Sequence, residues 1–125
     1  MKKVIHTTKA PEPIGPYNQA IMIGDTLYVS GQIPINPETK EIAKGDVKMH
    51  TEQVMKNLQA ILHEAGMDFT NVVKCSIFVS DMKHFPLVNE VYGSYFKDMQ
   101  PARETVQVSG LPMDVDVEIS CFAVV

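Results

Sequence analysis

The change of hydrophobic period near residue 46 constrains the fold of this chain more than any other feature. The period becomes helical from about Asp46 to Ala65, where apolar residues three, four or seven apart recur at Val47, Val54, Leu58, Ile61, Leu62 and Ala65. Such spacing predicts an amphipathic helix, and Gly66 directly after it suits a C-cap. Before and after this segment, apolar and polar residues alternate, which is typical of strands.

Strand patterns lie on both sides of the predicted helix. The predicted strands cover residues 2–6, 20–23, 27–29, 72–79, 104–109 and 115–125. Gly24-Asp25, between the second and the third, suits a two-residue hairpin turn. The inner face of the fourth strand is predicted to hold Val73, Cys75, Ile77 and Val79.

A second helix is predicted between the strand at residues 72–79 and the strand at residues 104–109. It begins near Pro86, a residue that suits a first helical turn, and it ends before Pro101. Its apolar side is predicted to hold Val88, Val91, Tyr92, Tyr95, Phe96 and Met99.

This order of elements predicts an α+β fold of two layers, with one mixed sheet and two helices packed on one face. The length of 125 residues predicts one domain, residues 1–125. The sheet face that looks away from the helices combines polar residues with Phe78, Phe122 and Val124. A face that is half apolar suggests burial against another copy of the chain.

Composition narrows the range of partners. The formal charge is −4, with 11 basic and 15 acidic residues and no basic cluster, so nucleic-acid binding is not expected. No apolar run reaches the roughly 20 residues of a membrane span. Residues 1–6 contain two lysines with no apolar region behind them, so they are not expected to be a signal peptide. Cys75 and Cys121 are expected to be buried, reduced thiols. The expected compartment is the cytoplasm.

Motifs for metal and cofactor chemistry are absent from the sequence. The histidines, His6, His50, His63 and His84, form no HxxxH pair, and none stands at ligand spacing from a cysteine. There is no GxSxG and no glycine-rich phosphate motif. We therefore expect neither a metal nor a cofactor.

Two charged residues within strand-like sequence need a reason. Arg103 follows Pro101-Ala102, and Glu118 interrupts a run of valine and isoleucine in VDVEIS. One reading is that both face solvent or form a cross-strand ion pair. The other is that they face each other across a small acidic substrate. A further irregularity is Ser30-Gly31 in YVSGQIP, since glycine within a strand marks a bulge or a close backbone approach to a ligand.

Taken together, these segments form a string that spans nearly the whole chain. IGPYNQA, YVSGQIP, VNEVYGSYF, PARETVQV and LPMDVDVEI follow one another with a spacing that resembles the reactive-intermediate deaminase family, also named Rid, YjgF-like or L-PSP. The resemblance implies a chorismate-mutase-like fold that assembles as a homotrimer, with three clefts between subunits.

The resemblance also implies roles for individual residues. Arg103 would bind the carboxylate of the substrate, and Glu118 would activate a water molecule. The residues that would line the same cleft are Tyr17, Ser30, Gly31, Asn89 and Thr105. Guanidinium matches a carboxylate in two-point contact, and a carboxyl group in a partly dry cleft can accept and return a proton.

The implied reaction is hydrolysis of 2-enamino or 2-imino acids, such as 2-aminoacrylate, 2-iminobutanoate and 2-iminopropanoate. The products would be 2-oxo acids and ammonia, and removal of these intermediates would protect enzymes that depend on pyridoxal phosphate. Two alternatives remain: a non-catalytic trimer that binds a small regulatory ligand, and the translation inhibitor or endoribonuclease named for relatives.

Two segments depart from the family pattern. Glu104-Thr105 stands where the deaminases carry Ser-Cys, and Ser109-Gly110 stands where they carry Ala-Arg. Activation of water does not need the missing thiol, so hydrolysis is compatible with Thr105. Glu104 would weaken carboxylate binding only if its side chain pointed into the cleft, and strand alternation predicts that it points the other way.

Overall fold

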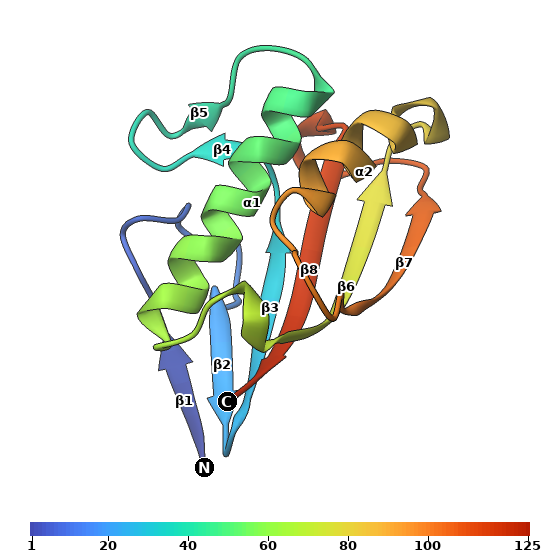
Figure 1. Cartoon of the computed structure of the whole chain (residues 1–125). Coiled ribbons are helices and arrows are strands. Elements are labelled where there is room, and N and C mark those ends of the chain that lie inside the picture. The colour runs from blue at the N-terminus through green and yellow to red at the C-terminus, as the bar shows by residue number, and fades with distance from the viewer.

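The chain folds into a six-stranded sheet with two helices on one of its faces, as described here from a computed structural model of residues 1–125 (Figure 1). The helices are α1, Val47–Glu64, and α2, Phe85–Gly93. The strands of the large sheet are β1 Lys2–Ile5, β2 Ala20–Ile23, β3 Thr26–Gln32, β6 Val72–Val79, β7 Ala102–Gln107 and β8 Val117–Val124. A separate two-stranded ladder joins β4, Ile35–Asn36, to β5, Glu41–Ile42.

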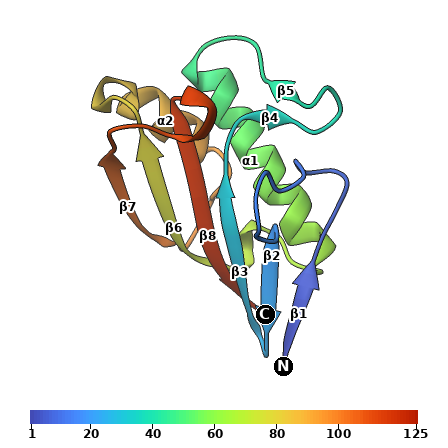
Figure 2. The ribbon, with the colours of Figure 1, turned by 180° about the vertical axis from the view of Figure 1, so that it is seen from behind.

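The sheet is mixed, with the strand order β1-β2-β3-β8-β6-β7. Every neighbouring pair is antiparallel except β6 and β7, which are parallel and joined through α2. The view from behind shows the second face of the sheet without a covering helix (Figure 2). The predicted two-layer α+β fold with two helices on one face is therefore confirmed.

Helix α1 begins and ends where its sequence predicts. The Asp46 side chain caps its start by accepting hydrogen bonds from the backbone N–H groups of Lys48 and Met49. At its end Gly66 has a φ of +75°, a left-handed conformation that costs glycine little. The inner side of α1 fills the core with fully buried Leu58, Ile61 and Leu62, and each such side chain contributes about 1.5–3 kcal/mol through burial.

Three details of the predicted elements are wrong. Val73 is 48% exposed, because a bulge at the start of β6 lets Val72 take the inward position instead. Helix α2 ends at Gly93, and Tyr95 and Phe96 reach the core from the turns that follow it. Met99, predicted on the helix's apolar side, is 94% exposed and has a φ of +50°.

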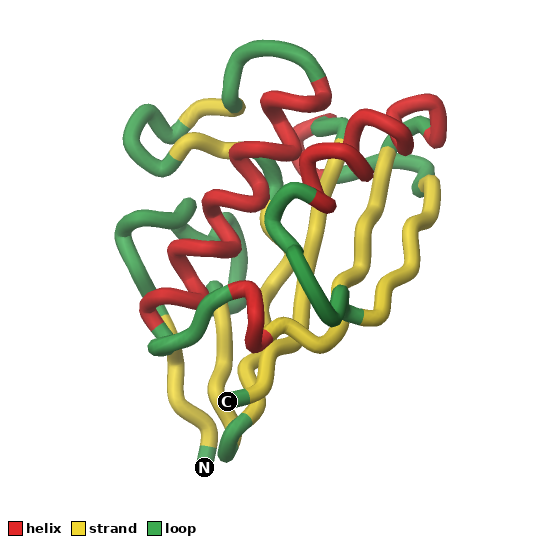
Figure 3. Tube along the Cα trace, viewed as in Figure 1, coloured by secondary structure: helices red, strands yellow, loops and turns green.

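The loops are concentrated at the two ends of the sheet (Figure 3). The longest of them runs from β1 to β2 across residues 6–19. The predicted hairpin turn is confirmed, since Ile23 pairs with Thr26 and Gly24 has a φ of +57°. No helix of the chain is long and apolar enough to cross a bilayer.

Candidate functional site

Glu118 lies on β8 and points to the face of the sheet that has no helix. Its neighbours Val117 and Ile119 are fully buried beneath the helices, so strand alternation turns Glu118 the other way. The carboxylate has no hydrogen-bond partner within the chain and lies in a pocket of about 330 Å³. That pocket is lined by Ile14, Tyr17, Ser30, Gly31, Ile33, Pro112 and Glu118.

Partial burial raises the pKa of the Glu118 carboxyl above its ordinary value, and no positive charge offsets this effect. A raised pKa brings the group closer to neutral pH, where a carboxyl can both accept and return a proton. The environment of Glu118 therefore suits a general base.

The predicted irregularity in β3 is a β-bulge at Ser30-Gly31. Val29 pairs with Cys121 and Gln32 pairs with Ile119, so two residues of β3 face the single residue between them on β8. A Cβ atom on Gly31 would lie 2.3 Å from Oε2 of Glu118. The bulge and the missing side chain thus leave the space that the carboxylate occupies.

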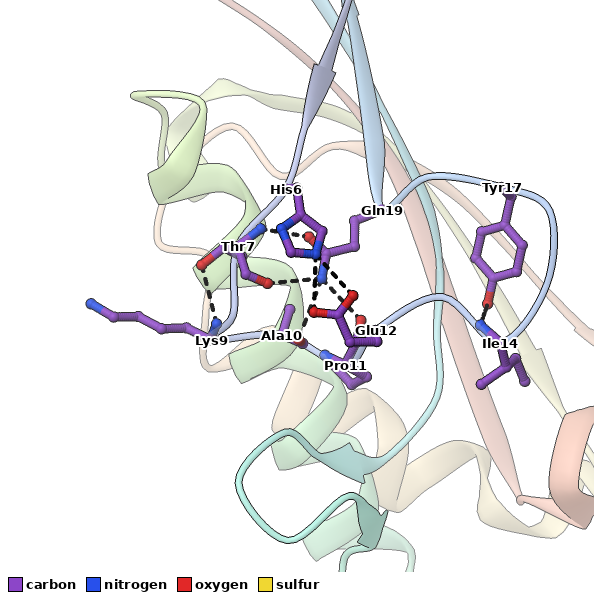
Figure 4. A network of polar contacts seen from close by, with 9 residues as sticks. All are labelled: His6, Thr7, Lys9, Ala10, Pro11, Glu12, Ile14, Tyr17 and Gln19. Atoms are coloured by element: carbon purple, nitrogen blue, oxygen red, sulfur yellow. Dashed lines mark hydrogen bonds and ion pairs between the residues drawn. The ribbon is translucent and has the colours of Figure 1, made fainter.

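The hydroxyl of Ser30 donates a hydrogen bond within the chain. Its Oγ donates to the carbonyl of Asn18 at 2.6 Å, and its backbone N–H donates to the carbonyl of Gln19 at 2.9 Å. The hydroxyl can still accept a hydrogen bond from a ligand. Tyr17 lies on the loop that contains Asn18 and Gln19, and its hydroxyl accepts a hydrogen bond from the N–H of Ile14 at 3.3 Å (Figure 4).

Arg103 lies on β7 and points to the opposite, helix-covered face. It is the only arginine in the sequence. Its Nη1 donates to Oδ1 of Asn89 on α2 at 2.8 Å, and the guanidinium carbon lies 5.0 Å from the ring centroid of Tyr92 and 5.6 Å from that of Phe85. These neutral contacts hold the guanidinium without neutralising it.

No carboxylate pairs with Arg103. The ion pairs of the chain involve only lysines and histidines as cations. Thr105, two residues along the same strand, has a buried hydroxyl without a hydrogen-bond partner. An unpaired guanidinium beside a free hydroxyl is suited to a small anion.

Glu104 points away from Arg103, as strand alternation predicts. It pairs with Lys74, at 3.0 Å between Nζ and Oε1, and accepts a hydrogen bond from Ser76. The bond from Ser76, followed by that from Lys74, lowers the pKa of Glu104. Its charge is thus balanced on the open face and lies outside the Arg103 site.

The predicted residues therefore fall into two groups on opposite faces of the sheet. We call Arg103, Asn89 and Thr105 the arginine half-site, and Glu118, Tyr17, Ser30 and Gly31 the glutamate half-site. Within one chain the structure does not bring them together. Cys75 is directly opposite Arg103 in the sheet, whereas Phe78, three residues further along β6, is opposite Glu118.

Sequence reasoning missed the two rings beside Arg103 and the apolar walls around Glu118. Tyr92 was assigned to the core, which is correct, but its ring also faces the guanidinium. Phe85 directly precedes Pro86, and no local pattern marks it as a neighbour of β7. Only the parallel crossover through α2 brings these residues together.

His50 lies in the first turn of α1 and is partly buried. Its Nδ1 lies 2.9 Å from both carboxylate oxygens of Asp116, and its Nε2 lies 2.8 Å from the carbonyl oxygen of Ala43. The contact ties α1 to the chain two residues before Glu118.

No three His, Cys, Asp or Glu side chains converge as ligands for a metal.

The family model described as endoribonuclease L-PSP matches residues 7–125. The chain belongs to the Rid family, for which L-PSP is another name. This Rid protein is 52% identical over 122 residues to a RutC family protein of Pyrococcus abyssi, covering 98% of this chain and 96% of that one. It is 46% identical over 124 residues to the mouse 2-iminobutanoate/2-iminopropanoate deaminase, covering 99% and 92%.

Solved structures of Rid proteins have the same fold. A Rid-family protein of Yersinia pestis matches with a TM-score of 0.97 at 46% identity, over 100% of both chains. Escherichia coli TdcF, solved with bound serine, matches with a TM-score of 0.94 at 39% identity, over 98% of both chains.

Proposed function

We propose that this Rid protein hydrolyses short 2-imino acids, with their enamine tautomers, to 2-oxo acids and ammonia. The observation that carries the proposal is the half-buried guanidinium of Arg103, which is held by Asn89 and two aromatic rings and has no acidic partner. A carboxylate would supply the missing charge. The serine bound to TdcF carries such a carboxylate, and the mouse relative is named for this reaction.

We further propose that each complete site forms between two copies of the chain, within a homotrimer. The two half-sites point to opposite faces of the sheet, so one chain cannot enclose a three-carbon or four-carbon substrate with both. The open face bears Tyr28 and Phe122, each 45% exposed, with ring centroids 5.3 Å apart. Burial of this face against a neighbour would bring a second chain to the edge of the Glu118 pocket.

The chemistry proposed for this site needs one anchor and one proton carrier. Arg103 would hold the substrate carboxylate and so fix the adjacent C=N carbon. Glu118 of the neighbouring copy would take a proton from water as the oxygen attacks that carbon, which forms a C–O bond and transfers the C=N electron pair to nitrogen. The proton would then pass to nitrogen, which gives a carbinolamine. The carboxylate would next take the hydroxyl proton and give it to the amino nitrogen, so that the C–N bond breaks and ammonia leaves as the C=O bond forms. The balance is imino acid plus water to 2-oxo acid plus ammonia.

The direct test is the rate of ammonia release from imine generated in the assay by a serine or threonine dehydratase. The wild-type chain should accelerate release, and Arg103→Ala should abolish the acceleration. Equal rates with and without the protein would eliminate the catalytic proposal and favour the non-catalytic ligand-binding trimer.

A test of the carboxylate site alone uses the single arginine of the chain. An arginine-selective dicarbonyl reagent can form its adduct at only one position, and intact-mass measurement would count it. A small 2-oxo acid such as 2-oxobutanoate should slow the modification, whereas a neutral amide of the same length should not. Equal modification rates with and without the 2-oxo acid would contradict anion binding at Arg103.

The name of the matching family model favours RNA cleavage as a second candidate function. RNA binding depends mainly on cationic surface, and the net charge of −4 opposes it. A cleavage activity that persists unchanged in the Arg103→Ala and Glu118→Gln proteins would come from elsewhere than the proposed site.

A further inference from the structure

A buried amide outside the two half-sites holds the loop that carries Tyr17. Gln19 directly precedes β2 and is 1% exposed. Its Oε1 accepts the backbone N–H of Thr7 at 2.8 Å. Its Nε2 donates to the carbonyls of Thr7, Ala10 and Pro11 at 3.0, 3.3 and 2.9 Å (Figure 4). One side chain thus satisfies four backbone groups in a loop without helix or strand.

The opposite end of this loop is fixed to the bulge beside Glu118. Ser30 bonds the carbonyls of Asn18 and Gln19 through its hydroxyl and its N–H, as described above. The side chain of Gln19 therefore joins the beginning of the loop, at residues 7–11, to the part of its end that is bound to β3. Between these two fixed points the chain passes through Ile14 and Tyr17, which both line the Glu118 pocket.

The Gln19 contacts have no substitute elsewhere in the loop. The backbone groups that Gln19 satisfies have no other backbone partner. The other contacts in residues 6–12 are the exposed pair of His6 and Glu12, at 2.9 Å, and the bond from the N–H of Lys9 to the Thr7 hydroxyl, and neither reaches the end of the loop. Buried polar backbone groups that lose their partner drive a loop to rearrange toward water. Loss of the amide would therefore release residues 7–11 and shift the residues that follow them.

We propose that Gln19 is a positioning residue, which fixes Tyr17 and Ile14 over the Glu118 carboxylate. This inference rests on the proposed function for its kinetic consequence, whereas its structural consequence can be measured without any activity. Gln19 touches no reacting atom in this account; it acts only through the loop.

The kinetic test compares two substitutions that remove a bracing amide. Gln19→Met keeps the length of the side chain but removes all four hydrogen bonds. Asn71→Ala is the matched control, since the Asn71 amide also braces the chain, donating to the carbonyl of Val124 and accepting from the N–H of Asp68, at the end of β6 remote from Glu118. We expect kcat to fall about 10- to 100-fold for Gln19→Met, as misplacement of an active-site group does, and to stay within about twofold for Asn71→Ala. Equal kcat values for Gln19→Met and the wild type would overturn the inference.

A reporter separates this inference from the proposed function. The chain has no tryptophan, so Tyr17→Trp supplies a single fluorophore on the loop. Adding Gln19→Met should raise acrylamide quenching of Trp fluorescence at least about twofold, by exposing the loop, whereas adding Asn71→Ala should leave it unchanged. Unchanged quenching in both would refute the bracing role even if activity fell.

A milder variant guards against a protein that fails to fold. Gln19→Asn keeps both the acceptor and the donor of the amide but shortens its reach by one methylene group, so its kcat and quenching should lie between those of the wild type and Gln19→Met. If the wild type had no activity but Gln19→Met still raised the quenching of the Tyr17→Trp reporter, the proposed function would be refuted and the bracing role of Gln19 would stand. If the wild type were active and both Gln19 variants had its kcat, the proposed function would stand and the positioning role of Gln19 would be refuted.

Discussion

Arg103 and Glu118 lie two strands apart in the same sheet, yet their side chains leave it from opposite faces. Arg103 contacts Asn89 and the rings of α2 on the helix side, while Glu118 lies opposite Phe78 on the side without helices. A single chain therefore presents an anion anchor and a candidate base that cannot meet. The predictions below follow from this separation and from the surroundings of each residue.

Arg103→Lys should lose most of the activity although it keeps the positive charge. A guanidinium can donate to Asn89 and still offer a planar fork to a carboxylate, whereas an ammonium group is a single point of charge. We expect KM to rise at least about tenfold, which corresponds to the loss of one charge-assisted hydrogen bond. Steady-state kinetics with imine generated in the assay would measure it. A wild-type KM in Arg103→Lys would show that fork geometry has no role.

Glu118→Gln should abolish most of the rate and stabilise the fold at neutral pH. Loss of a general base costs about 10²- to 10⁴-fold in kcat. Burial raises the pKa of Glu118, so the folded chain binds this proton more tightly than the unfolded chain. The stability that this proton contributes is fully present below the unfolded pKa and is lost as pH rises through the folded value. The neutral amide avoids that loss, so denaturant melts should show Glu118→Gln more stable than wild type at pH 7 and equal to it near pH 3.

The same raised pKa predicts how the rate depends on pH. As a base, Glu118 must be ionised, so kcat/KM should rise with pH through a midpoint above the ordinary glutamate value. Glu118→Gln should remove this step from whatever rate remains. A step of the same midpoint in Glu118→Gln would assign the titration to another group.

Gly31→Ala should damage the site through one methyl group. The new Cβ would lie 2.3 Å from Oε2 of Glu118, so the carboxylate must move. We expect kcat/KM to fall at least about tenfold with little change in helix and strand content. Gly93→Ala is the matched control, because a Cβ at Gly93 meets nothing within 4 Å and alanine suits a helix end. If both variants had wild-type activity, the close approach of Gly31 would have no function.

The sequence predicted the architecture well because that architecture depends on hydrophobic period. The helix over α1, the Gly24-Asp25 turn and the Ser30-Gly31 bulge all follow from local patterns. The exposed Val73 did not, because a bulge between Val72 and Lys74 puts the start of β6 out of phase with the rest of the strand, and no residue type marks it. Met99 was misplaced because the aromatic residues after Gly93 continue a helical spacing without continuing the helix.

The candidate site could be predicted only in part. Motif resemblance chose the residues, and strand alternation correctly turned Glu104 away from Arg103. The separation of Arg103 from Glu118 depends on which strands become neighbours and on the register of β6 with β7 and β8, and both are set by long-range packing. The bracing role proposed for Gln19 could not be predicted from the sequence either, because no local pattern shows which four loop groups its amide contacts.

The open sheet face should control assembly. Phe122→Glu places a charge at the centre of the Tyr28–Phe122 pair and should convert the proposed trimer into monomers that lack activity. Met49→Glu is the control, since Met49 is also exposed, at 57%, but lies on α1 at the other face. Size-exclusion chromatography with light scattering would give the masses. Monomers with full activity would contradict a site shared between chains.

Subunit mixing is the most direct test of that shared site. Arg103→Ala and Glu118→Gln chains, each inactive alone, would be unfolded together in equal amounts and refolded. If every site takes Arg103 from one chain and Glu118 from its neighbour, about a quarter of the mixed sites hold both native residues, and about a quarter of the wild-type activity should return. A mixture as inactive as its two components would contradict the account, because it would show that the two residues must come from the same chain or do not act together.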